Sequence, residues 1–185
     1  MRFPGHALES FRLRVGTWYA RFHFRAANEP VIRFTDAVSQ ARRAIVFLPE
    51  SASEASAVES VLRFLAEQFH TSKVLLVARK ELTAALPEHR GFNLFTYAAD
   101  DLNSWFLPRP DLLRKLKKST FDVALDLNRG FALPSSFLCR ASQAPLRISF
   151  VKPYADSFYN FQVQTTQSNN LSEDYSKLLK CIEMF

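Results

Sequence analysis

The sequence predicts a three-layer α/β fold, in which a mostly parallel sheet of about six strands lies between helices. From residue 44 onward, short apolar runs alternate with segments of helical periodicity, which is typical of βα units. The 185 residues suffice for one domain and an extension. With 48% hydrophobic and 23% charged residues, the chain is expected to be globular. We divide it into an extension at residues 1–43 and a single domain at residues 44–185.

Short apolar runs predict the strands of this domain. Five of them read as buried strands, and the sixth alternates between apolar and polar residues, as a half-exposed strand does. Helical segments separate most of the strands, so the strands are expected to run parallel. The predicted strands are residues 44–48, 73–78, 92–97, 121–127, 146–150 and 158–164.

Apolar residues three and four positions apart predict the helices between these strands. Asp111 is placed to cap the third of them, which is basic, and Pro87 ends the short second one. A polar stretch at residues 165–174 precedes a final amphipathic helix that ends at Phe185. The other predicted helices are residues 57–69, 81–86, 111–118 and 131–141, and the final helix is expected to turn Leu178, Leu179 and Ile182 inward.

The extension is expected to form a basic amphipathic helix. Residues 1–43 hold eight arginines and three acidic residues, so their net charge is +5 (8 − 3), against +6 for the whole chain. Residues 28–30 end the helix, and residues 31–34 then form a short extra strand before residues 36–43 lead into the sheet. The apolar side of the helix carries Leu8, Phe11, Val15, Trp18, Tyr19 and Phe22, and Arg14, Arg21 and Arg25 lie beside it.

This apolar side is the strongest functional signal in the sequence. Burial of six large apolar side chains contributes on the order of 10 kcal/mol before entropy, so the side has to cover something. Three surfaces are possible: the sheet of the domain itself, a partner protein, or a bilayer. Arginine in place of lysine favours the planar contacts found at interfaces. In the loop at residues 100–110, Trp105 and Phe106 either dock on a partner or fold back onto the sheet.

Other charged and sulfur-containing residues are expected to be structural. Asp122 and Asp126 lie about 13 Å apart on the strand at residues 121–127, too far for a carboxylate pair, and both are expected to bond loop amides. The basic run Arg114, Lys115, Lys117 and Lys118 is expected to be a solvated helix face. Cys139 and Cys181 match no ligand spacing and are expected to be buried thiols. We therefore expect no metal and no cofactor.

The stretch LLRKLKKSTFDVALDLN (residues 112–128), followed by an apolar helix and PLRISFV (residues 145–151), resembles the N-terminal Rossmann-like half of lipopolysaccharide heptosyltransferases, which are GT-B glycosyltransferases. The similarity covers residues 44–151. It extends to short bacterial proteins that keep only this half and precede it with a basic helix. The resemblance implies a Rossmann-like fold.

One loop departs from the pattern of these enzymes. Their loop after the first strand holds a glycine that lets substrates approach and an aspartate that acts as base. The corresponding loop here, LPESASEASAVES (residues 48–60), has neither, and Glu54 is the only carboxylate near the right place. Together with Glu50 and Glu59 it would repel a phosphate. The enzyme half that holds the nucleotide-sugar is also absent from the sequence, so we expect no catalytic residues.

These observations favour a non-catalytic accessory or scaffold subunit that docks on a larger, membrane-associated complex. With neither a signal peptide nor a long apolar run, the protein is expected in the cytoplasm, where it could lie on the membrane surface. One alternative is a sugar-nucleotide binder or glycosyltransferase-like enzyme that uses Glu54, Asp126 and Arg129 with a partner domain. A nucleic-acid-binding protein is a second alternative, disfavoured because the arginines alternate with large apolar residues. The expected partner-binding residues are Phe11, Arg14, Trp18, Tyr19, Arg21, Phe22, Arg25, Trp105 and Phe106.

Overall fold

A computed structural model of the chain describes residues 5–25, 38, 40–55, 57–87, 91–165 and 170–184, with residues 5 and 6 described in their backbone only. Within this part, six parallel strands form one sheet in the order β3-β2-β1-β4-β5-β6. The predicted α/β fold with a sheet of about six strands is confirmed. The strands are β1 (Ala44–Phe47), β2 (Val74–Arg79), β3 (Asn93–Tyr97), β4 (Val123–Asp126), β5 (Leu146–Phe150) and β6 (Phe161–Val163).

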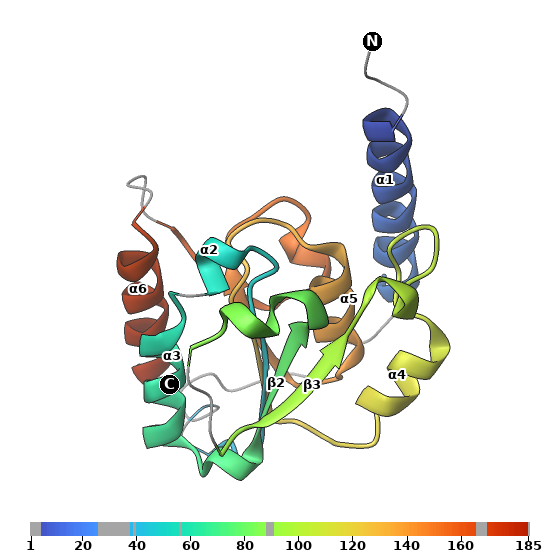
Figure 1. Cartoon of the computed structure of the whole chain (residues 1–185). Coiled ribbons are helices and arrows are strands. Elements are labelled where there is room, and N and C mark those ends of the chain that lie inside the picture. The colour runs from blue at the N-terminus through green and yellow to red at the C-terminus, as the bar shows by residue number, and fades with distance from the viewer. Residues whose placement is uncertain are drawn as a thin grey trace.

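Helices cover both faces of the sheet, as Figure 1 shows. One layer consists of α3 (Glu59–Gln68) and α6 (Leu171–Glu183), and the other consists of α4 (Pro110–Leu116) and α5 (Leu133–Ala141). Short helical segments connect the strands. They are α2 (Ala52–Ala55) and the 3₁₀ turns η2 (Thr71–Lys73), η3 (Lys80–Ala85), η4 (Ala99–Asp101) and η5 (Ala155–Ser157).

Strand β1 is apolar throughout because each of its faces contacts a helical layer. In β1, Ala44 and Val46 belong to the core cluster under α3 and α6, whereas Ile45 and Phe47 belong to the cluster under α4 and α5. All four side chains are buried. The sheet runs outward in opposite directions from β1 and β4, and the crevice at the carboxyl ends of such a pair is where open α/β sheets bind ligands.

Some details differ from the sequence-based expectations. Asp111 does not cap α4, because the N-cap position is Arg109 and no side chain caps the helix; Asp111 instead pairs with Arg114 one turn further on. The final helix begins at Leu171, so the end of the predicted polar stretch forms its first turn. Leu178 and Ile182 are buried in it as expected, and Leu179 is half-buried. The predicted strand at residues 31–34 lies outside the described residues.

The N-terminal helix, α1 (Gly5–Phe24), is present as predicted, but its apolar side faces outward. The helix lies along α5 and extends past the carboxyl edge of the sheet (Figure 1). It contacts the domain through small residues, since Gly16, Thr17 and Ala20 are buried. Phe24, at the end of the same side, packs against Phe137 of α5 with 4.8 Å between ring centroids. The sheet of the domain is therefore not the surface that the apolar side covers.

Gly16 makes this close approach possible. A Cβ at this position would overlap the backbone carbonyl oxygen of Trp105 and would lie 2.9 Å from Cδ2 of Leu133. Backbone and a buried leucine cannot move aside easily, so only a residue without a side chain allows the helix to sit this close.

We expect Gly16→Ala to lower the free energy of unfolding by about 1–3 kcal/mol, because the added methyl group pushes α1 off the domain. Helix propensity by itself predicts the opposite sign, a gain of about 1 kcal/mol. Urea denaturation followed by circular dichroism measures the difference. Gly130→Ala is the matched control, because a Cβ there has no neighbour within 4 Å. A more stable Gly16→Ala protein would contradict the close contact.

Candidate functional site

An open cavity of about 540 Å³ lies beyond the carboxyl ends of the central strands. It is at the point where the order of the sheet reverses. The N-terminal half of α1 forms one of its walls, so a segment predicted as an extension borders the crevice of the domain. Its polar lining residues are Glu9, Ser10 and Arg12 of α1, Glu50 after β1, Arg79 of β2, and Asn103 and Ser104.

Glu50 lines this cavity, as does the carboxylate of Glu9 on α1. Oε1 of Glu50 accepts hydrogen bonds from the hydroxyl of Tyr97 (2.7 Å) and from Oγ of Ser135 (2.8 Å). Its backbone N–H donates to Oδ1 of Asn128 (2.8 Å), which ties the loop after β1 to the loop after β4. Burial, and then the charge of Glu50, raise the pKa of Tyr97 far above its usual range, so the phenol stays protonated and remains a donor.

Asp126, at the end of β4, is fully buried and belongs to a structural network. Its Oδ2 lies 2.8 Å from Nζ of Lys152, which also donates to the carbonyl of Asn128 (2.8 Å). The hydroxyl of Tyr159 donates to the same carboxylate, and the backbone N–H of Asn128 donates to Oδ1 (3.1 Å). Burial and the nearby charge of Asp126 raise the pKa of Tyr159 well above its usual value. The expected bond to a loop amide is confirmed, but the buried lysine was not foreseen.

The other two residues suggested for an enzymatic site are not free in the cavity: Arg129 is paired with a carboxylate, and Glu54 lies elsewhere. Nε of Arg129 lies 3.0 Å from the buried carboxylate of Asp174 on α6. Glu54 is half-buried on α2 and does not line the cavity. Asp122 accepts hydrogen bonds from the backbone N–H groups of Arg42 (2.8 Å) and Arg43 (2.9 Å), as expected for a residue that holds a loop.

The basic run and the cysteines are structural. Arg114 and Lys115 are exposed on α4, and Lys117 and Lys118 are exposed directly after it, so the run is solvated as predicted but the helix ends at Leu116. Cys139 and Cys181 are free thiols, but only Cys139 is fully buried, and burial raises its pKa above the usual range. The described residues contain no group of three or more ligands that could hold a metal.

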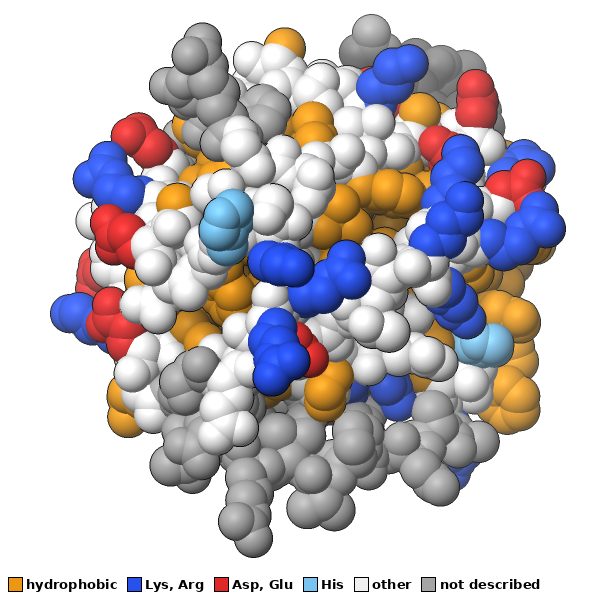
Figure 2. Space-filling view, turned by 90° about the horizontal axis from the view of Figure 1, so that it is seen from below, with side chains coloured by type: hydrophobic (Ala, Val, Ile, Leu, Met, Phe, Trp, Pro, Cys, Tyr) orange, Lys and Arg blue, Asp and Glu red, His pale blue; other side chains and the backbone are white. Residues whose placement is uncertain are grey.

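The outer side of α1 carries a row of exposed large apolar side chains. We call Leu8, Phe11, Trp18, Tyr19 and Phe22 the aromatic stripe. Trp18 is 68% exposed, Phe22 65% and Phe11 58%, and the rings of Trp18 and Phe22 stack with centroids 6.0 Å apart. In the view from below, hydrophobic side chains lie at the right-hand edge, on the side where α1 stands in Figure 1, with Lys and Arg side chains nearby (Figure 2).

The structure places the two loop aromatics differently. Trp105 is 38% exposed and lies edge-on to Phe11, with 6.4 Å between ring centroids, so it adjoins the aromatic stripe. Phe106 folds back against the core cluster under α4 and α5 and has a left-handed backbone (φ 59°). Phe106 therefore folds back onto the domain, whereas Trp105 stays exposed, so docking on a partner remains a prediction for Trp105 alone.

The arginines of α1 lie on the flanks of the stripe. Arg14, Arg21 and Arg25 are exposed. Nε of Arg21 donates to Oγ of Ser157 (3.2 Å), and its guanidinium lies 5.3 Å from the ring centroid of Tyr154. Tyr154, like Phe106, has a left-handed backbone (φ 63°), so a strained aromatic residue sits in each of the two loops beside α1.

Comparison with solved structures shows which fold this is. The glycosyl transferase family 9 protein from Veillonella parvula superposes with a TM-score of 0.63 at 12% identity, over 83% of this chain and 44% of that one. The fold is that of a Rossmann-like glycosyltransferase half. *E. coli* heptosyltransferase WaaC with ADP gives a TM-score of 0.53 at 14% identity, over 75% of this chain and 46% of the enzyme.

The same enzyme with ADP-2-deoxy-2-fluoro heptose gives a TM-score of 0.51 at 16% identity, over 75% of this chain and 47% of the enzyme. The chain thus spans less than half the length of the glycosyltransferases it matches. At these identities the likeness concerns the fold, and it confirms the fold that the sequence resemblance implied.

No protein-family model and no curated protein matches the chain. Within its described residues, no helix is both long and apolar enough to cross a bilayer.

We expect Lys152→Met to lower the free energy of unfolding by about 3–5 kcal/mol, because it leaves the buried carboxylate of Asp126 without its cation. The double variant Asp126→Asn with Lys152→Met should be more stable than Lys152→Met alone. Arg63→Met is the control, since its ion pair with Glu59 is exposed and should contribute less than about 1 kcal/mol. Equal losses of free energy of unfolding in Lys152→Met and Arg63→Met would show that the buried pair contributes no more to stability than the exposed one.

Proposed function

We propose that the protein is a non-catalytic scaffold or accessory subunit that docks on a larger, membrane-associated assembly through the aromatic stripe of α1. The observation that carries this proposal is the outward orientation of the stripe: its five large side chains are exposed while the opposite side of the helix is buried. A row of exposed apolar side chains flanked by arginines is typical of an interaction surface.

The chemistry of the stripe fits a protein interface. Trp, Tyr and Arg are enriched among the residues that dominate binding energy. Leu8 to Phe22 spans about 20 Å along the helix axis, long enough to engage a partner helix or groove. Because Gly16 holds α1 against the domain, the stripe is already ordered, which lowers the entropy cost of docking.

The state of the charged residues supports a non-catalytic role. Asp126 and Arg129 are held in ion pairs with Lys152 and Asp174, and both of these pairs include a fully buried carboxylate. Neither is available as an acid, a base or a substrate ligand without breaking the fold around it. We infer that these residues maintain the loops at the carboxyl edge.

We expect Trp18→Ser combined with Phe22→Ser to release the protein from its assembly while its circular dichroism and thermal midpoint stay within error, because both side chains are exposed. The measurement is co-purification of the tagged protein from its native cells with and without the substitutions. Met184→Ser is the matched control, since Met184 is 77% exposed on α6. Unchanged co-purification of the double variant would refute docking through the stripe.

A second candidate function is sugar-nucleotide binding or a glycosyltransferase-like reaction with a partner domain. The observation that favours it is the cavity at the carboxyl edge, into which Glu50 projects beside Arg79. Enzymes of this fold include a heptosyltransferase solved with ADP and with an ADP-sugar analogue. If this candidate is correct, Glu50, which follows β1 closely, has the role in the enzymatic site that the sequence suggested for Glu54.

Calorimetry with a panel of ADP-sugars and UDP-sugars separates the two candidates. The scaffold proposal predicts no saturable heat. Binding that falls at least about tenfold in Glu50→Gln and is unchanged in Glu54→Gln would favour the second candidate, because loss of one charged hydrogen-bonding group has an effect of this size. Circular dichroism of both variants checks that the contacts of Glu50 with Tyr97 and Ser135 are not needed for folding.

A further inference from the structure

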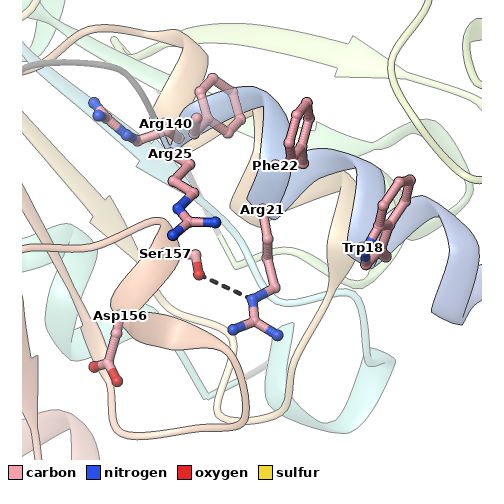
Figure 3. A pocket seen from close by; sticks show the side chains of 8 residues that line it. Trp18, Arg21, Phe22, Arg25, Arg140, Asp156 and Ser157 are labelled. Carbon is pink, nitrogen blue, oxygen red and sulfur yellow. Dashed lines mark hydrogen bonds between the residues drawn. The ribbon is translucent and has the colours of Figure 1, made fainter.

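A groove of about 540 Å³ lies between the C-terminal half of α1, the end of α5 and the loop after β5. It differs from the cavity at the carboxyl edge and was not predicted. Its wall from α1 combines the ring pair of Trp18 and Phe22 with Arg21 and Arg25 (Figure 3). The other lining residues are Phe24, Arg140, Asp156 and Ser157.

The cationic groups of α1 converge inside this groove. In Figure 3, the guanidinium groups of Arg21 and Arg25 lie on two sides of Ser157, whose hydroxyl accepts a hydrogen bond from Nε of Arg21 (3.2 Å). Arg140 forms the far wall, where its guanidinium lies 5.6 Å from the ring centroid of Phe24. Two guanidinium groups and a hydroxyl therefore face one small volume.

The single carboxylate in the lining does not neutralise these arginines. Oδ1 of Asp156 accepts a hydrogen bond from Nε2 of Gln162 (2.7 Å), and the carboxylate points away from Arg21 and Arg25 in Figure 3. Across the portion of the chain that the structure describes, neither Arg21 nor Arg25 forms an ion pair with a carboxylate. Among the described residues, Arg21 and Arg25 thus place positive charge without a paired carboxylate next to an apolar wall.

We propose that this groove binds a phosphate group carried by a partly apolar molecule. Arg21 and Arg25 contact the phosphate oxygens, since a guanidinium matches this geometry with paired, charge-assisted hydrogen bonds. Ser157 adds a further hydrogen-bonding hydroxyl, and the Trp18–Phe22 ring pair contacts the apolar part. The molecule is either a soluble phosphate ester or the headgroup of an anionic lipid. This site does not rest on the proposed docking function.

The test uses the full chain and two probes. Calorimetry with inorganic pyrophosphate at low salt reports the soluble source, and co-sedimentation with phosphatidylcholine vesicles, with and without phosphatidic acid, reports the lipid source. The variants are Arg21→Gln and Arg25→Gln, whose side chains are exposed and not needed for the core. Arg63→Gln is the matched control, because Arg63 is an exposed arginine on α3 that lines neither the groove nor the cavity at the carboxyl edge.

We expect saturable binding of at least one probe that weakens at least about tenfold in each groove variant and stays unchanged in Arg63→Gln. Higher salt should weaken it further. If the groove variants lose binding to pyrophosphate alone, the ligand is a soluble ester. If they lose binding to phosphatidic acid vesicles alone, the ligand is a lipid.

Three results would overturn the proposal. They are the absence of binding to both probes, an equal loss of binding in Arg63→Gln, which would indicate attraction by net charge alone, and a lower thermal midpoint in Arg25→Gln with unchanged binding. The last result would mean that the arginines only stabilise the C-terminal end of α1. Because Trp18 and Phe22 line both the stripe and the groove, the arginine variants alone test this site, and release of the Trp18→Ser, Phe22→Ser variant from its assembly tests only the docking proposal.

Discussion

The close contact between α1 and the domain at Gly16 is the constraint on which the rest of this surface depends. The backbone of the helix meets the carbonyl of Trp105 and the side chain of Leu133, and no side chain fits between them. Once the small residues on one side of α1 are buried, its aromatic residues must face the other way. Apolar area alone would have buried the aromatic stripe, but shape complementarity decided the orientation.

This placement gives one helix three different surroundings. Its N-terminal half borders the cavity at the carboxyl edge, its C-terminal half supplies the arginines of the groove beside α5, and its outer side carries the aromatic stripe. A rigid helix that contributes to three surfaces can couple what happens at one of them to the others. Any movement of α1 would change both hollows and the stripe together.

Buried charge fixes the carboxyl edge of the sheet. Asp126 ends β4 and Lys152 follows the neighbouring parallel strand β5, and Arg129 and Asp174 connect the loop after β4 to α6. A buried ion pair contributes little net stability compared with an apolar pair, but it is costly to break. It therefore selects one arrangement of the loops, which accounts for carboxylates that resemble catalytic residues in sequence and are structural in the fold.

The sequence by itself determined the α/β fold, the parallel strands and the N-terminal helix, because period and apolar content depend on local spacing. It also indicated that Asp122 bonds a loop and that the basic residues of α4 are solvated. Only the tertiary structure decided which side of α1 is buried, that Asp126 pairs with Lys152, and that Arg21 and Arg25 line the same groove as Ser157. Each of these contacts joins residues distant in the chain, and their distance depends on how whole elements pack, which no local pattern encodes.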